Sequence, residues 1–254
     1  METHLIIIPS YNTGEILKPT VEAAVQTWGH TWVVIDGSTD DSSSSLDLLC
    51  ADYPNLRILK LAENQGKGAA VLHGARLAAK EGYTHILTMD ADGQHPTEAI
   101  LPALERSRTS PEAVIMGQPI FGDDVPLERF YFRKLNNFWT AVETLGAGLG
   151  DTLFGMRVYP LDPFVDVMEK TAYARGFDFD PEISVRLVWA GFQPIQLKIP
   201  VRYLQSEEGG VSHFHYVRDN MKLIFLHLRL LWRWITGGAY KSFRNKRRWR
   251  SQSS

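Results

Sequence analysis

Short apolar runs alternate with segments of helical spacing through the first half of the chain. Each run has the length and the β-branched content of a buried strand, and each ends at a turn-forming or polar residue. The runs lie at residues 4–8, 31–35, 56–61, 85–89 and 113–116, and the helical segments lie at residues 14–28, 41–53, 66–82 and 97–109. Continuous apolar strands separated by helices are typical of a mainly parallel sheet with helices on both faces. The pattern therefore predicts an α/β fold with right-handed crossovers.

A different pattern begins at residue 216, after a predicted body at residues 1–215. From Val217 to Ile235, apolar residues recur at helical spacing on two faces, and a basic stripe separates the faces. The stripe consists of Arg218, Lys222, Arg229 and Arg233. Two apolar faces need two partners, one of which should be the body; the other could be lipid, a second copy or a further helix. We therefore predict an amphipathic helix and a polybasic tail over residues 216–254.

Charge is unevenly distributed along the chain. The sequence holds 27 Lys and Arg against 29 Asp and Glu, a formal net charge of −2. Six of the basic residues and no acid lie between Lys241 and Arg250, which leaves 21 basic against 29 acidic residues, or −8, in the rest. A basic tail beside an amphipathic helix favours an anionic membrane surface over a homodimer interface, although a solvated terminus is the simpler alternative. Nucleic acid is disfavoured as a partner, because the body is acidic and no recognition module is visible.

Composition narrows the expected location. The 254 residues are 44% hydrophobic, enough for one large core. The single Cys50 cannot form an internal disulfide, and the start METHLIIIPS lacks the basic residues and longer apolar run of a signal peptide. No apolar run approaches the ~18 residues of a membrane-spanning helix. We expect a cytoplasmic protein, peripheral at the inner face of the membrane.

The candidate chemistry lies where the predicted strands end. In open parallel sheets the carboxyl ends of the strands share one edge, and ligands bind there. The segment DADGQH follows the fourth strand and contains Asp90, Asp92 and Gln94. Carboxylate and amide oxygens suit Mg²⁺ or Mn²⁺ and leave coordination positions for substrate phosphates. A polar turn is the alternative, since Asp-Gly pairs favour turns.

The endings of the first three strands supply candidates for binding a nucleotide. In NQGKGAA, Lys67 stands between two glycines that let the backbone approach phosphate oxygens, just before a helix. Lys67 is expected to contact phosphates or clamp the loop; an exposed lysine at a helix cap is the alternative. Tyr11 can stack on a base, and Asp36 can accept hydrogen bonds from a uracil imide or a ribose hydroxyl. Neither a P-loop nor G-x-G-x-x-G is present, which argues against dinucleotide dehydrogenases.

Taken in order, the segments IIIPSYN, VVIDGSTDDS, NQGKGAA and DADGQHP resemble family 2 glycosyltransferases of the GT-A fold. The resemblance is strongest with the branch of dolichol-phosphate mannose synthases and polyprenyl-phosphate sugar transferases. It continues in DTLFGMRVY and in FDFDPEISVRLVWAGFQPIQLKIPVRY, and covers about residues 4–215. It implies a nucleotide-sugar donor held by Pro9, Tyr11, Asp36 and Lys67. It also implies that the acids and amide of DADGQH bind a divalent cation, Mg²⁺ or Mn²⁺.

The chain departs from the family's pattern at four places. Ile35 replaces the first of two consecutive acids that usually precede Gly-Ser. The basic, serine-containing helix of the polyprenyl branch is matched by Arg129, with Arg133 at the serine position. The lysine that usually follows the serine of GGVSHF is His213, and several residues are inserted after Arg202. The donor is therefore better supported than the lipid or lipid-phosphate acceptor.

The implied mechanism is direct displacement at the anomeric carbon with inversion, accelerated by in-line geometry and charge stabilisation. A phosphate acceptor is already an oxyanion and needs no base, whereas a hydroxyl acceptor needs one near its proton. The expected catalytic residues are Asp92, Glu182 as a base or acceptor-orienting acid, and Asp180 as the second candidate. Arginines could hold an anionic acceptor by charge-assisted hydrogen bonds, although each could equally form a structural ion pair. The expected substrate-binding arginines are Arg129, Arg133, Arg157 and Arg202.

Two other functions remain open at this point. A nucleotidyltransferase on a related sheet would release pyrophosphate from a nucleoside triphosphate, but the glycine-rich signature at the first strand is missing. A catalytically silent module that binds sugar nucleotides or membranes would tolerate Asp90→Asn without loss of cellular function.

Overall fold

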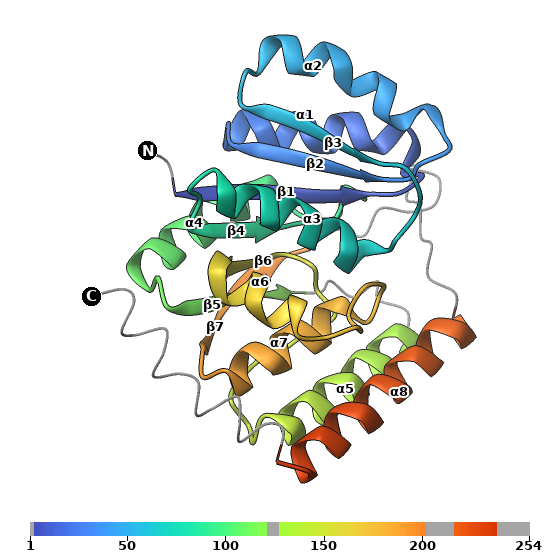
Figure 1. The fold of residues 1–254 in the computed structure, drawn as a ribbon, viewed down its shortest axis with the longest axis vertical. Coiled ribbons are helices and arrows are strands. Elements are labelled where there is room, and N and C mark those ends of the chain that lie inside the picture. The colour runs from blue at the N-terminus through green and yellow to red at the C-terminus, as the bar shows by residue number, and fades with distance from the viewer. Residues whose placement is uncertain (1–2, 121–126, 202–215, 238–254) are drawn as a thin grey trace.

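The computed structural model describes residues 3–120, 127–201 and 216–237, apart from the side chains of residues 127–130 and 216–220. These residues form a seven-stranded sheet of order β3-β2-β1-β4-β6-β5-β7 (Figure 1). Strand β6 is antiparallel to its neighbours β4 and β5, and the other pairs are parallel. The strands are β1 His4–Ser10, β2 Thr31–Asp36, β3 Leu56–Leu61, β4 His85–Thr88, β5 Ala113–Ile120, β6 Arg157–Pro160 and β7 Gln193–Pro200. The prediction of a mainly parallel α/β sheet is confirmed.

Helices cover both faces of the sheet. Successive residues of a strand point to opposite faces, so an apolar strand needs helices on both sides to bury its side chains. On β1, Ile6 and Ile8 belong to one core cluster and Leu5 and Ile7 to the other. The first cluster includes residues of α1, α2 and α4, and the second includes residues of α3, α6, α7 and α8. The helices are α1 Leu17–Thr27, α2 Asp47–Asp52, α3 Lys67–Lys80, α4 Ile100–Thr109, α5 Leu127–Glu143, α6 Leu161–Glu169, α7 Phe179–Trp189 and α8 Tyr216–Ile235, with 3₁₀ turns η1 Gly14–Ile16, η2 Asp41–Leu46 and η3 Thr97–Ala99.

Parallel pairing brings the predicted polar endings to one edge of the sheet. The register aligns Ser10 of β1 with Ile35 of β2, and Ile7 of β1 with Thr88 of β4. The segments that follow β1, β2 and β4 therefore leave the sheet next to one another, and the segment after β3 leads into α3.

Helices α5 and α8 lie side by side at the end of the molecule away from β3 (Figure 1). The predicted helix at residues 217–235 is present as α8. Leu226 and Leu230 are fully buried against the body, whereas Ile224, Phe225 and Leu228 are exposed. One apolar face of α8 thus packs on the body and the other is open. In the part of the chain that the structure describes, no helix is long and apolar enough to cross a membrane.

Candidate functional site

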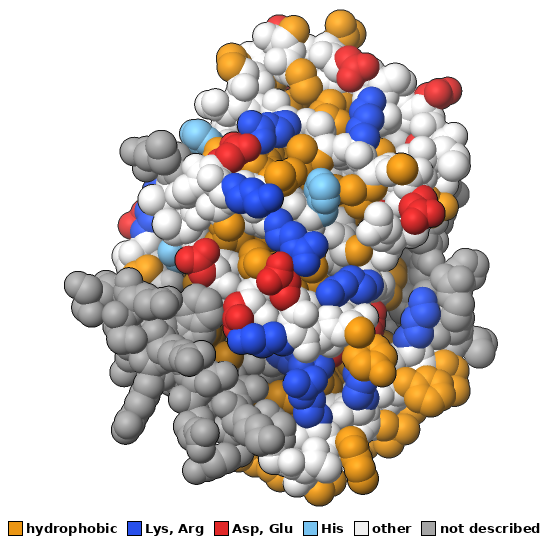
Figure 2. Space-filling model, in the orientation of Figure 1, with side chains coloured by type: hydrophobic (Ala, Val, Ile, Leu, Met, Phe, Trp, Pro, Cys, Tyr) orange, Lys and Arg blue, Asp and Glu red, His pale blue; other side chains and the backbone are white. Residues whose placement is uncertain are grey.

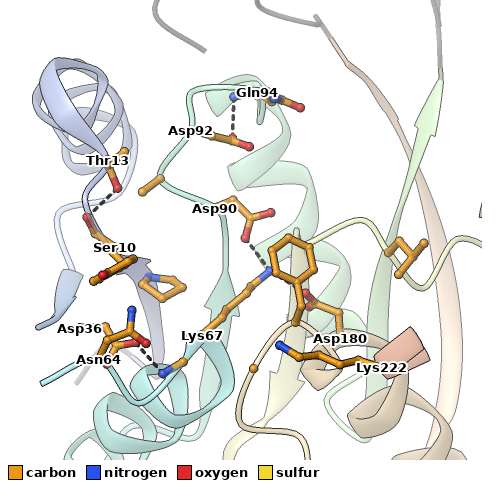
Figure 3. Close-up of a pocket in the computed structure, with 17 residues that line it drawn as sticks. Ser10, Thr13, Asp36, Asn64, Lys67, Asp90, Asp92, Gln94, Asp180 and Lys222 are labelled. Atoms are coloured by element: carbon orange, nitrogen blue, oxygen red, sulfur yellow. Dashed lines mark hydrogen bonds and ion pairs between the residues drawn. The ribbon is translucent and has the colours of Figure 1, made fainter. Parts of the chain in front are cut away.

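A pocket of about 360 Å³ opens at the carboxyl edge of the sheet (Figure 3). Its walls come from the segments that follow β1, β2, β3 and β4, from the start of α7 and from α8. The structure brings together eight of the residues predicted from the sequence. These are Pro9, Tyr11, Asp36, Lys67, Asp90, Asp92, Gln94 and Asp180.

Asp36, at the end of β2, fixes the loop that precedes α3. Its carboxylate accepts hydrogen bonds from the backbone N–H groups of Gln65 at 2.9 Å and Gly66 at 2.7 Å. The side chain is buried, and the loop passes close to it because residue 37 is a glycine: a Cβ there would lie 2.3 Å from the Asn64 nitrogen. Gly66 has a φ of +97°, which glycine adopts without strain. Asp36 therefore holds in place the turn that presents Lys67.

Lys67 begins α3 and lies between two carboxylates. Its Nζ is 2.6 Å from Asp90 Oδ1 and 2.5 Å from Asp180 Oδ2. Burial disfavours the charged ammonium, but the two carboxylates outweigh burial and raise the pKa of Lys67. Lys67 is therefore a permanent cation that connects the end of β4 to α7.

Asp90 follows β4, and both of its carboxylate oxygens have partners. Oδ1 pairs with Lys67, and Oδ2 lies 3.2 Å from His95 Nε2. Burial favours the neutral acid, but Lys67 and His95 hold the pKa of Asp90 well below its usual range. Gly155 leaves room for this carboxylate, since a Cβ at residue 155 would lie 2.3 Å from Asp90 Oδ2. The position of Asp90 thus depends on the absence of a side chain at residue 155.

Asp92 lies in the turn after Asp90, where Gly93 has a φ of +71°. Its Oδ1 accepts a hydrogen bond from the Gln94 backbone N–H at 3.0 Å. Burial and the charge of Asp90 raise the pKa of Asp92. The corner therefore has an excess of negative charge that a cation would relieve.

The groups at this corner fit an oxygen-preferring divalent cation. Nowhere in the described ranges do three or more His, Cys, Asp or Glu side chains form a group that could hold a metal ion. Asp90, Asp92 and Gln94 instead provide two carboxylates and one amide. A set with so few protein ligands suits Mg²⁺ or Mn²⁺ when substrate phosphates and water complete the coordination shell.

The two acids predicted as base candidates on α7 are separated by the geometry of the helix. Residues two apart on a helix point about 200° apart, so Asp180 lines the pocket and Glu182 does not. Glu182 is fully buried, accepts a hydrogen bond from Arg186 Nε at 2.8 Å and pairs with Arg229 of α8. The expectation that Glu182 acts as a base or orients the acceptor does not fit this placement. Its contacts instead attach α8 to the body.

Arg157, expected to hold substrate, is a buried partner of Asp180. Its side chain has no exposed surface. Its Nη1 donates to Asp180 Oδ1 at 3.0 Å and to the Asp180 carbonyl at 2.7 Å, and its Nη2 donates to the Thr152 carbonyl at 2.6 Å. Arg157 does not line the pocket, and these contacts fix the orientation of Asp180.

Arg133, the other described arginine side chain expected to hold substrate, does not line the pocket either. Arg133 donates to Asp151 Oδ2 at 2.7 Å, an ion pair between α5 and the segment before β6. The Arg129 side chain and the whole of Arg202 lie outside the described residues.

Several residues of the pocket were not predicted from the sequence. Lys222 of α8 is the most consequential, because the sequence assigned it only to a basic stripe on a helix (Figure 3). Phe177 precedes α7, and the hydroxyls of Ser10 and Thr13 hydrogen-bond to each other at 2.8 Å. The others are Asn64, Ala91, Leu153 and Gly176. Helical spacing could show which residues share a face with Lys222, but not that this face meets a pocket built by other segments.

Comparison with known proteins adds sequence relatives to this geometry. Residues 5–160 match the model of the family described as glycosyl transferase family 2. The polyprenol monophosphomannose synthase of Mycolicibacterium smegmatis is 28% identical over 213 residues, which cover 81% of this chain and 78% of the relative. The undecaprenyl-phosphate mannosyltransferase of Micrococcus luteus is 27% identical over 212 residues, which cover 81% of this chain and 85% of the relative.

Solved structures share the fold. Glucosyl-3-phosphoglycerate synthase from Mycobacterium tuberculosis, solved with Mn²⁺, UDP-glucose and phosphoglyceric acid, superposes with a TM-score of 0.63 at 15% identity, over 90% of this chain and 79% of that one. Mannosyl-3-phosphoglycerate synthase from Rubrobacter xylanophilus gives a TM-score of 0.63 at 13% identity, over 90% and 72% of the two chains. At these identities the likeness concerns the fold alone, and the expected GT-A fold is confirmed.

Proposed function

The chain belongs to glycosyl transferase family 2 and is a glycosyltransferase, and from that premise we propose that it transfers a sugar, with inversion, from a nucleotide-sugar donor to a polyprenyl-phosphate or other lipid-linked acceptor. One observation carries the proposal: Asp36, Lys67, Asp90 and Asp92 converge on one pocket at the carboxyl edge of the sheet. The names of the two bacterial relatives, both enzymes of polyprenyl-phosphate mannosylation, support the class of acceptor.

The donor would lie along the pocket from β1 to β4. Tyr11 is 37% exposed at the rim, as an aromatic ring that stacks on a base must be. Pro9 and Asp36 line the adjoining wall, where the Asp36 oxygens have lone pairs beyond those used by the loop. Lys67 would contact the diphosphate as an ammonium at the start of a helix.

Asp90, Asp92 and Gln94 would hold Mg²⁺ or Mn²⁺. When bound, such an ion supplies charge neutralisation on the departing diphosphate. The environment of Asp92 supports this assignment, because burial and then the charge of Asp90 raise the pKa of its carboxyl group. So does the solved glucosyltransferase of the same fold, which contains Mn²⁺ together with its nucleotide sugar.

A phosphate acceptor agrees best with the acids around the pocket. A hydroxyl acceptor would need a nearby base. Asp180, which lines the pocket, is paired with Lys67 and Arg157, and Glu182 is buried among arginines. A phosphate is its own nucleophile and needs a cation instead. Lys222, on the α8 side of the pocket, is suited to bind it.

An exposed apolar surface next to the pocket suits a lipid bilayer. Hydrophobic side chains gather over α5 and α8 at the lower edge of the molecule (Figure 2). We call this the α5–α8 surface; its exposed members are Tyr131, Leu135, Phe138, Val142, Met221, Ile224, Phe225, Leu228, Trp232, Trp234 and Ile235. Because Lys222 belongs to the same helix, a lipid embedded beside α8 would bring its phosphate to the pocket. We therefore propose peripheral attachment at the cytoplasmic face, with the basic tail at residues 241–250 contributing ~1 kcal/mol per basic residue near an anionic leaflet.

Transfer is tested with a panel of UDP-sugars and GDP-sugars, undecaprenyl phosphate in detergent, and Mg²⁺ or Mn²⁺, with mass spectrometry of the lipid products. We expect one sugar phospholipid that disappears with chelator and in Asp90→Asn. Asp52→Asn, on the exposed side of α2, is the matched control and should retain activity. If no sugar nucleotide binds with or without Mn²⁺, the proposal is wrong.

The two alternative functions give different results in the same experiments. A nucleotidyltransferase would release pyrophosphate from a nucleoside triphosphate. A silent module would bind sugar nucleotides without forming a product.

Membrane attachment is tested by sedimentation with vesicles that contain anionic lipid. Deletion of residues 241–254 should weaken sedimentation, and the loss should be smaller at high salt because exposed charges are screened. Unchanged sedimentation would remove the electrostatic part of the proposal. A homodimer that buries the α5–α8 surface would instead appear as a concentration-dependent mass in analytical ultracentrifugation.

A further inference from the structure

Lys67 occupies the oxygen of Asp90 that a divalent cation would need. Its Nζ lies 2.6 Å from Asp90 Oδ1 (Figure 3). Oδ2 of the same carboxylate lies 3.2 Å from His95 Nε2. Gly155 packs against that carboxylate so closely that even a methyl group there would collide with it. A cation can therefore gain Asp90 as a full ligand only if Lys67 gives up part of its ion pair.

Asp180 provides Lys67 with a second anchor that does not depend on Asp90. Its Oδ2 lies 2.5 Å from Lys67 Nζ, while its Oδ1 and carbonyl are held by the buried Arg157. Asp180 therefore stays in place whether or not Lys67 contacts Asp90. Asp90 and Asp180 thus offer two positions for the Lys67 ammonium. The position at Asp90 lies in the cation site, and the position at Asp180 lies beside it.

The charges that line the pocket make the order of binding matter. Its described walls carry four carboxylates, those of Asp36, Asp90, Asp92 and Asp180, against the ammonium groups of Lys67 and Lys222. A divalent cation placed beside Asp90 would meet the charge of Lys67 at short range. A nucleoside diphosphate brings negative oxygens that can bind both the Lys67 ammonium and the metal ion.

We propose that Lys67 is the counterion of Asp90 in the cation site until the divalent cation binds. Lys67 is then displaced from Asp90, and Asp180 retains it beside the donor diphosphate. This inference rests on the proposed function, because it assumes that Asp90 and Asp92 bind the cation. It makes binding of metal and nucleotide cooperative. The diphosphate offsets the repulsion between the metal ion and the Lys67 ammonium, and by reciprocity the metal ion strengthens nucleotide binding to the same extent. Metal alone binds weakly because it competes with Lys67.

Two simpler roles for Lys67 lead to different expectations. A plain phosphate contact would lower nucleotide affinity on substitution and leave binding of metal alone unchanged. A structural clamp between Asp90 and Asp180 would lower stability, and metal binding would weaken because Asp90 loses its position. Only displacement predicts that removing the lysine strengthens binding of metal alone.

The test is titration of Mn²⁺ followed by electron paramagnetic resonance of the free ion, with and without UDP or GDP, on the full chain. In the wild type, we expect nucleotide to raise Mn²⁺ affinity by about tenfold or more. In Lys67→Met, Mn²⁺ alone should bind about tenfold more tightly than in the wild type, and most of the coupling to nucleotide should disappear. Lys67→Arg keeps the charge and should keep weak binding and coupling. Lys80→Met removes an exposed lysine at the other end of α3 that does not line the pocket, and should change binding of Mn²⁺ alone by less than about twofold.

Unchanged or weaker binding of Mn²⁺ alone to a folded Lys67→Met protein overturns the inference and leaves the proposed function standing. Failure of the wild type to bind Mn²⁺ with either nucleotide refutes the metal site itself. Thermal melts establish that each variant is folded. If Lys67→Met does not melt cooperatively, Lys67→Gln, which keeps a hydrogen-bond donor for both carboxylates, is measured against the same expectations.

Discussion

Gly155 gives the sharpest test of the geometry at the cation corner. In Gly155→Ala, the new Cβ would lie 2.3 Å from Asp90 Oδ2 and 2.7 Å from both Cγ and Oδ1, whereas ordinary contact begins at 3.4 Å. The carboxylate must therefore retreat by roughly 1 Å, since Thr88 Oγ1 donates to the Gly155 carbonyl at 2.9 Å and restrains the backbone. The φ of residue 155 is not positive, so alanine adds no backbone strain.

A displacement of that size is expected to act on catalysis more than on stability. Misplacing a reacting group by about 1 Å can lower a rate by about 10²-fold, and we expect that loss in kcat/KM for sugar transfer. The free energy of unfolding should change by less than about 1 kcal/mol, because the group that moves is the end of a side chain and alanine reduces the entropy of the unfolded chain. Mn²⁺ binding in the presence of nucleotide should weaken in parallel.

The assay is product formation from the active sugar nucleotide and undecaprenyl phosphate, with denaturant unfolding on the same preparations. Gly29→Ala is the matched control: nothing lies within 4 Å of the position that a Cβ would take there, and the φ of residue 29 is not positive. It should behave as the wild type in both measurements. Wild-type transfer and Mn²⁺ binding in Gly155→Ala would refute the argument that Asp90 must keep its present position.

Three further predictions concern α8 and its contacts. Lys222→Met should raise the KM for polyprenyl phosphate about tenfold, the value of one charge-assisted hydrogen bond, and leave the KM for the nucleotide sugar within about twofold; equal changes in both would contradict an acceptor role. Leu228→Ser on the α5–α8 surface should lower vesicle affinity about tenfold, whereas Leu48→Ser, at an even more exposed leucine on α2, should not; equal losses would show that the effect is not specific to that surface. Glu143 Oε1 lies 2.9 Å from His227 Nδ1, and burial raises the pKa of the Glu143 carboxyl group. The stability that Glu143 contributes is therefore fully present below its pKa in the unfolded chain and is lost as pH rises through its pKa in the folded protein. Glu143→Gln should therefore gain stability relative to the wild type as pH rises above the ordinary pKa of a glutamate, about 4.3, in urea unfolding; a pH-independent difference would contradict this sign.

The candidate site divides into parts that local sequence determines and parts that it does not. The residues of DADGQH could be placed together at the cation site because they are neighbours in the chain and follow a recognisable strand. Asp180 and Glu182 could be recognised as unable to share a face, since they are two apart on a helix. Which of them faces the pocket depended on where α7 packs. Arg157, the first residue of β6, pairs with Asp180 only because tertiary packing brings the start of α7 to it.

The class of fold could be predicted from the sequence, because strand and helix periodicities are local and burial on both faces demands apolar runs. The shared edge of the polar strand endings could also be predicted, because parallel strands point the same way. Three contacts could be seen only in the folded protein: Lys67 bridges Asp90 and Asp180, Lys222 reaches the pocket, and Glu182 is buried against Arg229. Those contacts join residues more than twenty positions apart, and their distances follow from how whole helices pack on the sheet, which no local pattern encodes.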